Sequence, residues 1–215
     1  MIRKLAPIAL AIASAVIAPA AFAQSAGTWT VGIGAHNVAP DGNNGTIAAG
    51  TLEADVGDSV RPTVTLEYFI RDNLGIEVIA AWPFQHDISI KPTDPTIVNP
   101  AFSQVGTTKH LPPTVSLQYH FGQGRARPFV GGGVNYTYFF SEDTEGALAG
   151  NDLELKNSWG LAAHVGLDFD VTETSAIRVD ARWIDIDTKV RLNGADLGTV
   201  HIDPIVYGAA YVMQF

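Results

Sequence analysis

Residues 158–169, SWGLAAHVGLDF, decide the fold. Large apolar side chains occupy every second position from Trp159 to Phe169, while His164 and Asp168 fall on the opposite parity. A period of two predicts a β-strand with two unlike faces. The apolar face carries an aromatic ring near each end and aliphatic residues between them, which is typical of a strand that crosses a bilayer.

The same alternation recurs along the chain, and no helical period competes with it beyond the first 23 residues. The eight alternating segments are residues 28–38, 63–70, 74–84, 114–121, 130–140, 158–169, 177–183 and 205–215.

The connections between these segments alternate in length. Short turns are expected at 71–73, 122–127 and 172–175, and long loops rich in Gly, Asn, Asp, Pro and Thr at 39–59, 85–108, 141–156 and about 188–199. All of the predicted elements are strands, so the fold class is all-β. An even number of strands, with short turns at one end and long loops at the other, is typical of an outer-membrane barrel. We therefore expect an eight-stranded antiparallel transmembrane β-barrel with short periplasmic turns and long extracellular loops.

Aromatic residues on the apolar parity gather at two heights, as expected for a wall that spans a bilayer. The lower group comprises Trp29, Tyr68, Tyr119, Phe121, Phe169, Tyr211 and Phe215, and the upper group Trp82, Phe84, Tyr136, Tyr138, Phe140, Trp159 and Trp183.

Composition agrees with this prediction. The chain has 215 residues, of which 47% are hydrophobic and only 16% are charged. A wall that faces lipid needs an apolar residue at every second position of each strand, which accounts for the low share of charged residues. Its net charge of −9 argues against nucleic acid as a partner. The absence of cysteine excludes disulfides and thiolate sites.

Residues 1–23 have the features of a secretory signal peptide. Arg3 and Lys4 precede an apolar stretch, and Ala21-x-Ala23 fits a signal-peptidase site. Removing these two cations leaves the domain at residues 24–215 with a charge of −9 − 2 = −11. The predicted location is the outer membrane of a Gram-negative cell.

The last strand ends in aromatic and apolar residues of one parity. Tyr211, Met213 and Phe215 resemble the terminal signal by which the barrel-assembly machinery recognises its clients. That machinery, outer-membrane lipid and lipopolysaccharide are therefore expected partners.

The lower lumen is predicted to hold a charged floor, since an eight-stranded barrel has room only for side chains or one small ligand. Buried charges need partners, so this set is interpreted as a polar plug, with an ion or proton path as the alternative. The predicted floor consists of Glu67, Glu77, His164, Asp168, Arg178, Asp180 and Arg182.

The inward positions of the upper lumen are predicted to be apolar. Inward positions change from Arg178 and Arg182 to Ile184 and Ile186 within one segment. Either the register is kept and an apolar funnel opens outward, or a bulge reverses the two faces. The predicted funnel residues are Val38, Pro83, Pro112, Phe139, Ile184, Ile186, Ile202 and Val206, with Pro204 on the same parity.

Several segments together resemble the OmpW family of small outer-membrane barrels. They are residues 109–121 (KHLPPTVSLQYHF), 127–137 (RPFVGGGVNYT), 158–160 (SWG), 180–187 (DARWIDID) and the final Phe215. This resemblance covers most of residues 24–215 and implies an eight-stranded barrel. It also implies passage of small hydrophobic molecules, as for the related alkane-uptake protein AlkL, while some members of the family serve as colicin receptors.

The leading hypothesis is facilitated passage of small hydrophobic molecules. Lateral exit into the bilayer is expected because Pro weakens the ladder of a barrel wall, although Pro also simply ends strands. The prolines concerned are Pro62, Pro83, Pro112, Pro113 and Pro204.

Two other functions stay open. One is a surface-interaction barrel (a bacteriocin or phage receptor, or an adhesin) with an inert lumen. The other, much weaker, is a rim hydrolase built from Ser158, His110 and Asp185. No cofactor or metal site is expected, because the six His residues show no metal-ligand spacing. Asp185, Asp187 and the acidic loop 141–145 are interpreted as solvated charge, and the alternative is that they bind divalent cations that bridge lipopolysaccharide.

Overall fold

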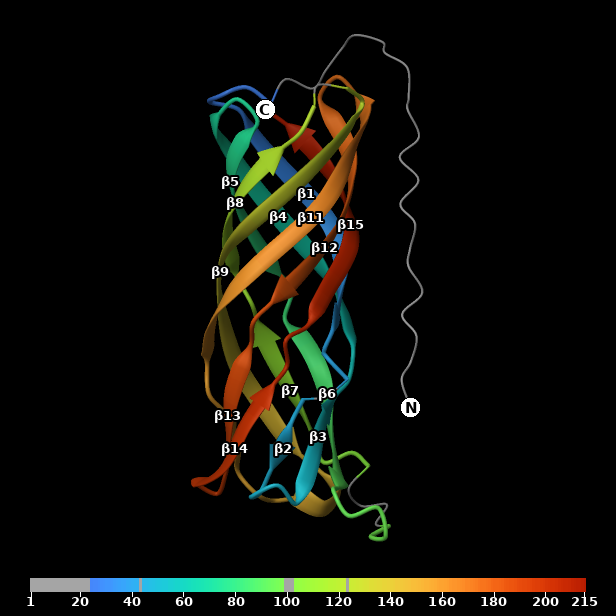
Figure 1. Ribbon diagram of the computed structural model, residues 1–215, viewed down its shortest axis with the longest axis vertical. Coiled ribbons are helices and arrows are strands. Elements are labelled where there is room, and N and C mark those ends of the chain that lie inside the picture. Colours follow the sequence, from blue (N-terminus) through green and yellow to red (C-terminus); the bar gives the residue numbers. More distant parts are fainter. Residues whose placement is uncertain (1–23, 43, 99–102, 123) are drawn as a thin grey trace.

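The computed structural model describes residues 24–42, 44–98, 103–122 and 124–215, so the predicted leader lies outside the described residues. Eight long antiparallel strands form a closed barrel in which each strand pairs with its sequence neighbour in the wall, and β1 pairs with β15 (Figure 1). This confirms the predicted fold class. The wall strands are β1 (Trp29–Ala39), β4 (Ser59–Arg71), β5 (Leu74–Ala81), β8 (Thr114–His120), β9 (Ala126–Thr144), β11 (Ser158–Thr172), β12 (Ser175–Ile184) and β15 (Ile205–Gln214).

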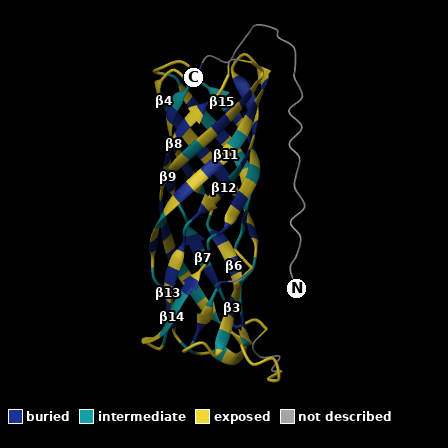
Figure 2. Cartoon of the chain, in the orientation of Figure 1, coloured by how far each residue is buried: buried dark blue, intermediate teal, exposed yellow. Residues whose placement is uncertain are grey.

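Alternation along each wall strand separates a lipid face from the lumen (Figure 2). On β11, Trp159 is 73% exposed and Val165 is also exposed, while His164 and Asp168 are buried. Exposed apolar and buried charged side chains invert the pattern of a water-soluble protein, as expected when lipid surrounds the barrel.

The segments predicted as long loops contain much β-structure, so that prediction is wrong for a large part of them. Seven shorter strands continue the barrel outward, at the end opposite the C-terminus (Figure 1). Alternation within 86–90 and 188–192 was the missed signal, because it turns apolar side chains inward there too. The strands of this extension are β2 (Thr46–Ile47), β3 (Leu52–Val56), β6 (Phe84–Pro92), β7 (Gly106–Leu111), β10 (Leu153–Leu155), β13 (Asp187–Leu192) and β14 (Ala195–His201).

Two sheets make up the extension. One has the order β9-β7-β6-β3-β2 and shares β9 with the barrel, and the other has the order β10-β13-β14. Most wall strands are interrupted where the barrel meets the extension. Pro83 separates β5 from β6, and Pro112 and Pro113 separate β7 from β8, as expected for a residue that cannot donate a ladder hydrogen bond.

Phe84 does not belong to the upper aromatic girdle. Inward positions are odd-numbered up to Ile79, but the break at Trp82 and Pro83 shifts the parity, so Phe84 faces inward and is only 2% exposed. The other predicted girdle residues on both groups are exposed or half-buried on the outer face, including Tyr211 and Phe215 of the C-terminal strand.

The chain from β12 into β13 keeps its register, so the bulge alternative is wrong. Ile184 and Ile186 continue the inward parity of Arg182 and are both buried, while Trp183 and Asp187 face outward.

Glycine on the inward face of β9 makes room in the lumen. A Cβ at Gly131 would lie 2.2 Å from Nε2 of His164, and one at Gly133 would lie 2.0 Å from the backbone oxygen of Val115. Residues without a side chain therefore let groups of the two neighbouring strands, β11 and β8, lie close to the backbone of β9. No helix among the described residues is long and apolar enough to cross a membrane.

Candidate functional site: an apolar pocket above a charged floor

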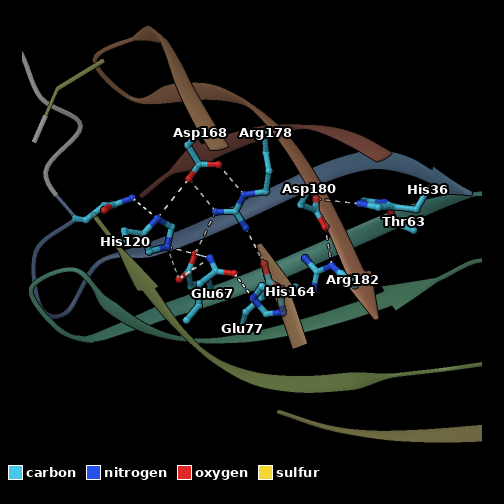
Figure 3. A network of polar contacts seen from close by, with 12 residues as sticks. His36, Thr63, Glu67, Glu77, His120, His164, Asp168, Arg178, Asp180 and Arg182 are labelled. Carbon is cyan, nitrogen blue, oxygen red and sulfur yellow. Dashed lines mark hydrogen bonds and ion pairs between the residues drawn. The ribbon is translucent and has the colours of Figure 1, made fainter. Parts of the chain in front are cut away.

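Arg178 on β12 is the centre of the charged floor (Figure 3). Its guanidinium donates to both carboxylate oxygens of Asp168, at 2.7 and 2.9 Å, and to Glu77 at 2.7 Å. It also donates to Glu67 at 3.4 Å, and its cation lies 4.5 Å from the ring centre of Phe129. A fully buried cation is thereby paired on all sides, which is what its removal from water requires.

Glu77 on β5 links this cation to a second one. Its two oxygens accept hydrogen bonds from Arg178 at 2.7 Å and Arg182 at 2.6 Å, and Arg182 also donates to Asp180 at 2.7 Å. These contacts join β5 directly to β12 across the lumen (Figure 3). The structure therefore brings the predicted charged floor residues together in one network.

Three further polar residues belong to the floor. His36 lies 3.1 Å from Asp180, and His120 lies 2.9 Å from Glu67. Gln118 donates to Glu67 and accepts from Nε2 of His164 at 2.8 Å. All three fall on the inward parity of their strands, as the alternation of the sequence indicates.

A second buried ion pair, Arg127 with Asp170 at 2.5 Å, lies toward the periplasmic end. The lower lumen is thus crossed by paired charges, and an apolar molecule would have to displace them to continue straight through.

Four of the predicted funnel residues lie together in the structure. Val38, Ile184, Ile186 and Val206 are buried in one hydrophobic cluster that continues into the extension. This layer separates the floor from the outer end of the molecule.

A pocket lies inside the extension, and the space not filled by atoms, open solvent included, is about 690 Å³. All seven strands of the extension contribute to its lining, which is almost entirely aliphatic or aromatic. The lining includes Ile47, Ile88, Ile90, Val105, Phe139, Leu148, Leu153, Leu155, Val190, Leu197, Val200 and Ile202.

The predicted funnel residues occupy different depths. Phe139 and Ile202 line the pocket, and Val38, Ile184, Ile186 and Val206 lie in the cluster beside it. Pro83 and Pro112 are half-buried at the junction. Most of the pocket comes from segments that were expected to be loops, so sequence reasoning missed it.

His86 on β6 and His110 on β7 form the main polar contact in the pocket lining. Their Nε2 atoms lie 2.8 Å apart, and Nδ1 of His86 lies 2.5 Å from the backbone oxygen of Gly57. His110 stacks between Phe84 and Phe139, with ring centres 5.5 and 5.6 Å away.

Both histidines are neutral at physiological pH. Burial lowers the pKa of His110 well below its usual range, and a positive charge on His86 would lower it further. Burial also lowers the pKa of His86, although the bond to Gly57 and the carboxylates Asp58 and Asp87 oppose that effect and Arg61 adds to it.

The structure does not assemble the imagined rim hydrolase. Ser158 Oγ accepts the backbone N–H of Asp187, and His110 is engaged with His86. Asp187, His201 and Asp203 do bring three ligand atoms within 4.8 Å of one another at the surface, but such exposed groups occur commonly without an ion, and we assign no metal to them.

We predict that Glu77→Ala destabilises the barrel by about 3–5 kcal/mol, because it leaves two buried guanidinium groups without their shared carboxylate. Equilibrium unfolding by urea in lipid vesicles measures the effect. Glu154→Ala is the matched control, since Glu154 on β10 is an exposed carboxylate paired with Lys156, and its unfolding midpoint should not change. Equal midpoints for Glu77→Ala and the parent protein would contradict the bridging role.

We predict that His86 and His110 make the protein acid-sensitive. An exposed histidine has a pKa of about 6.5, so below that pH the unfolded chain binds protons that the folded chain does not. Stability is therefore lost as the pH falls, by up to about 1.4 kcal/mol per pH unit for each histidine.

The measurement compares urea unfolding at about pH 7.5 and about pH 5.5 for the parent and a His86→Phe/His110→Phe variant. The variant differs from the parent only at these two positions, so it should lose less stability on acidification. An equal loss in the two proteins would show that the pair is not the cause.

Comparison with known proteins places this architecture in a family. The sequence profile of the OmpW family matches residues 25–215. Outer membrane protein W of Vibrio cholerae is 35% identical over 214 residues, covering 96% of this chain and 97% of that protein. Outer membrane protein AlkL of Ectopseudomonas oleovorans is 30% identical over 182 residues, covering 80% of this chain and 74% of the relative.

Further similarities agree with that placement. The dibenzothiophene metabolism operon protein PahQ of Pseudomonas aeruginosa is 30% identical over 196 residues, covering 87% of this chain and 88% of the relative. The crystal structure of the outer membrane protein OprG from Pseudomonas aeruginosa superposes with a TM-score of 0.79 at 30% identity, covering 91% of this chain and 99% of that chain. Protein W, AlkL and OprG are outer membrane proteins, and the chain belongs to the OmpW family.

Proposed function

We propose that this protein facilitates passage of small hydrophobic molecules across the outer membrane. A molecule enters the pocket of the extension from outside, and leaves sideways into the lipid instead of continuing through the charged floor. The observation that carries this proposal is the pocket itself, which is lined by apolar side chains inside a β-extension that stands above the bilayer. Such a cavity suits a hydrophobic ligand.

The relatives are consistent with this substrate class. PahQ is named for the metabolism of dibenzothiophene, a planar apolar compound.

Lateral exit is supported by a gap in the backbone hydrogen-bond ladder beside the pocket. This gap lies between β9 and β10 and is called the seam below. The ladder between β9 and β11 begins at Thr137 and Ser158. Farther out, β9 stays paired with β7, while β10 pairs with β13. Within the described chain, no backbone–backbone hydrogen bond joins residues 138–144 to residues 153–157.

Side chains hold this seam together instead. Asn157 accepts the backbone N–H of Phe139 at 3.1 Å and donates to the hydroxyl of Tyr136 at 2.9 Å. Thr144 donates to the backbone oxygen of Asn151 at 2.8 Å. Contacts of this kind can open without breaking a strand ladder.

The other boundary between the two extension sheets is closed by main-chain bonds. The backbone N–H of Ala48 donates to the backbone oxygen of Leu197, that of His201 to Asn44, and that of Asp41 to Ile202, with N···O distances of 2.8 to 3.0 Å. The seam between β9 and β10 is therefore the weaker of the two boundaries.

Pocket residues flank the weak seam on both sides. Phe139 lies on β9, and Leu153 and Leu155 lie on β10. Tyr138 and Trp159 face outward next to it, at the height of the upper aromatic girdle. An apolar molecule that passes between β9 and β10 would reach the outer edge of the bilayer directly.

We predict that Val190→Asp abolishes uptake, because it places a charge in the apolar pocket. Accumulation of radiolabelled naphthalene by intact Gram-negative cells that express the protein is the measurement. Lys189→Asp is the matched control: it introduces the same side chain one residue away on the outward face of β13 and should leave uptake unchanged.

A second substitution, Val190→Phe, fills the pocket without adding charge and should also reduce uptake. Both variants are checked for correct assembly in the membrane. Undiminished naphthalene uptake by correctly assembled Val190→Asp and Val190→Phe would refute the pocket as the route.

We predict that linking β9 to β10 blocks exit. Tyr138→Cys and Asn157→Cys continue the register beyond Thr137 and Ser158, and the chain has no other cysteine. Uptake should fall when the two cysteines are joined, by oxidation or by a short bis-maleimide, and the oxidised form should recover on reduction. Each single cysteine serves as control. Full uptake by the joined protein would argue for a different exit.

Contacts with lipopolysaccharide and recognition of the C-terminal strand by the assembly machinery belong to the same proposal. Tyr211, Met213 and Phe215 occupy the edge that pairs with β1, where Phe215 and Trp29 exchange backbone hydrogen bonds of 2.9 and 3.2 Å.

A further inference from the structure

The pair of His86 and His110 has a defined direction of hydrogen bonding. The backbone oxygen of Gly57 can only accept, so Nδ1 of His86 carries the proton of that 2.5 Å bond. In neutral His86, Nε2 is then an acceptor, and the proton between the two rings belongs to Nε2 of His110. Neutral His110 is left with a lone pair on Nδ1.

That lone pair has no partner in the described part of the chain. The ring of His110 is 3% exposed and is held between Phe84 and Phe139, so it cannot turn away into water. A buried acceptor without a donor is unfavourable, and a ligand that brings a donor relieves it.

The remaining polar groups of the pocket offer no free proton. The hydroxyl of Thr188 donates to the backbone oxygen of Lys156 at 2.7 Å, and the hydroxyl of Thr108 donates to the backbone oxygen of Lys109 at 3.5 Å. Both ring protons of the histidine pair are engaged as well. The pocket lining therefore presents acceptors on an apolar wall.

We propose that Nδ1 of His110 determines specificity by accepting a hydrogen bond from an apolar molecule that carries a single O–H or N–H group. The preferred ligands are medium-chain and aromatic alcohols, ahead of hydrocarbons, ethers and carboxylates of the same size. A carboxylate brings only acceptors and a charge that the neutral pair does not compensate. Because Nδ1 is buried, the ligand reaches it only when neighbouring side chains of the pocket move. This inference rests on the proposed function, since it assigns a substrate class to the same pocket.

The test compares two isomers, 1-nonanol and methyl octyl ether, which differ in having or lacking a donor. Binding to the protein in lipid nanodiscs is measured against empty nanodiscs, which corrects for partition into lipid. We expect the alcohol to bind about tenfold more tightly, the effect of one hydrogen bond in an apolar site. The His86→Phe/His110→Phe variant keeps two aromatic rings and should bind both isomers alike.

Thr188→Val is the matched control. It also removes a polar group from the pocket lining, but one whose proton is already donated to Lys156, so the preference for the alcohol should remain. Loss of the preference in Thr188→Val would overturn the assignment to His110.

A direct readout covers the case in which the double variant does not fold. The ¹⁵N resonance of Nδ1 in His110 should move when 1-nonanol is added to the parent protein and stay in place with the ether. An unmoved resonance, or equal affinity of the parent for the two isomers, overturns the inference and leaves the proposed function intact. Binding of neither isomer would instead refute the proposed function.

Discussion

The whole structure depends on one constraint: a chain surrounded by lipid must satisfy every backbone hydrogen bond within itself. A closed antiparallel ladder meets this requirement, and here it closes between β1 and β15. The closed ladder has eight wall strands, and eight strands leave a lumen that side chains fill. The remaining question for function is which side chains fill it at each height.

At the lower height the filling is ionic. Glu77 bridges Arg178 and Arg182, and these contacts hold opposite walls of the barrel together. Burying charges is costly unless each one is paired, which explains the density of the network. The same network makes straight passage of an apolar molecule unfavourable, so the floor both stabilises the barrel and directs any hydrophobic cargo elsewhere.

At the upper height the filling is apolar and the wall is discontinuous. The two sheets of the extension meet at a boundary with main-chain bonds on one side and at a seam held by Asn157 and Thr144 on the other. An apolar pocket next to a weak seam at the aromatic girdle links the packing of the extension to the proposed route. His86 and His110 add polar ring nitrogens to the lining of this mostly apolar pocket.

Alternation in the sequence alone determined the barrel, the lipid face and the inward charges, because side chains of a strand point to opposite faces with a period of two. It could therefore identify Arg178 and Ile186 as lumen residues. It did not reveal the extension, since short strands such as β10 carry too little pattern to stand out from loops. Nor did it foresee the parity change at Pro83 that turns Phe84 inward. Only the tertiary structure decided which strands pair beyond the bilayer, and hence the pocket, the seam and the contact of His86 with His110, because these arise from pairings and registers that a period of two does not specify.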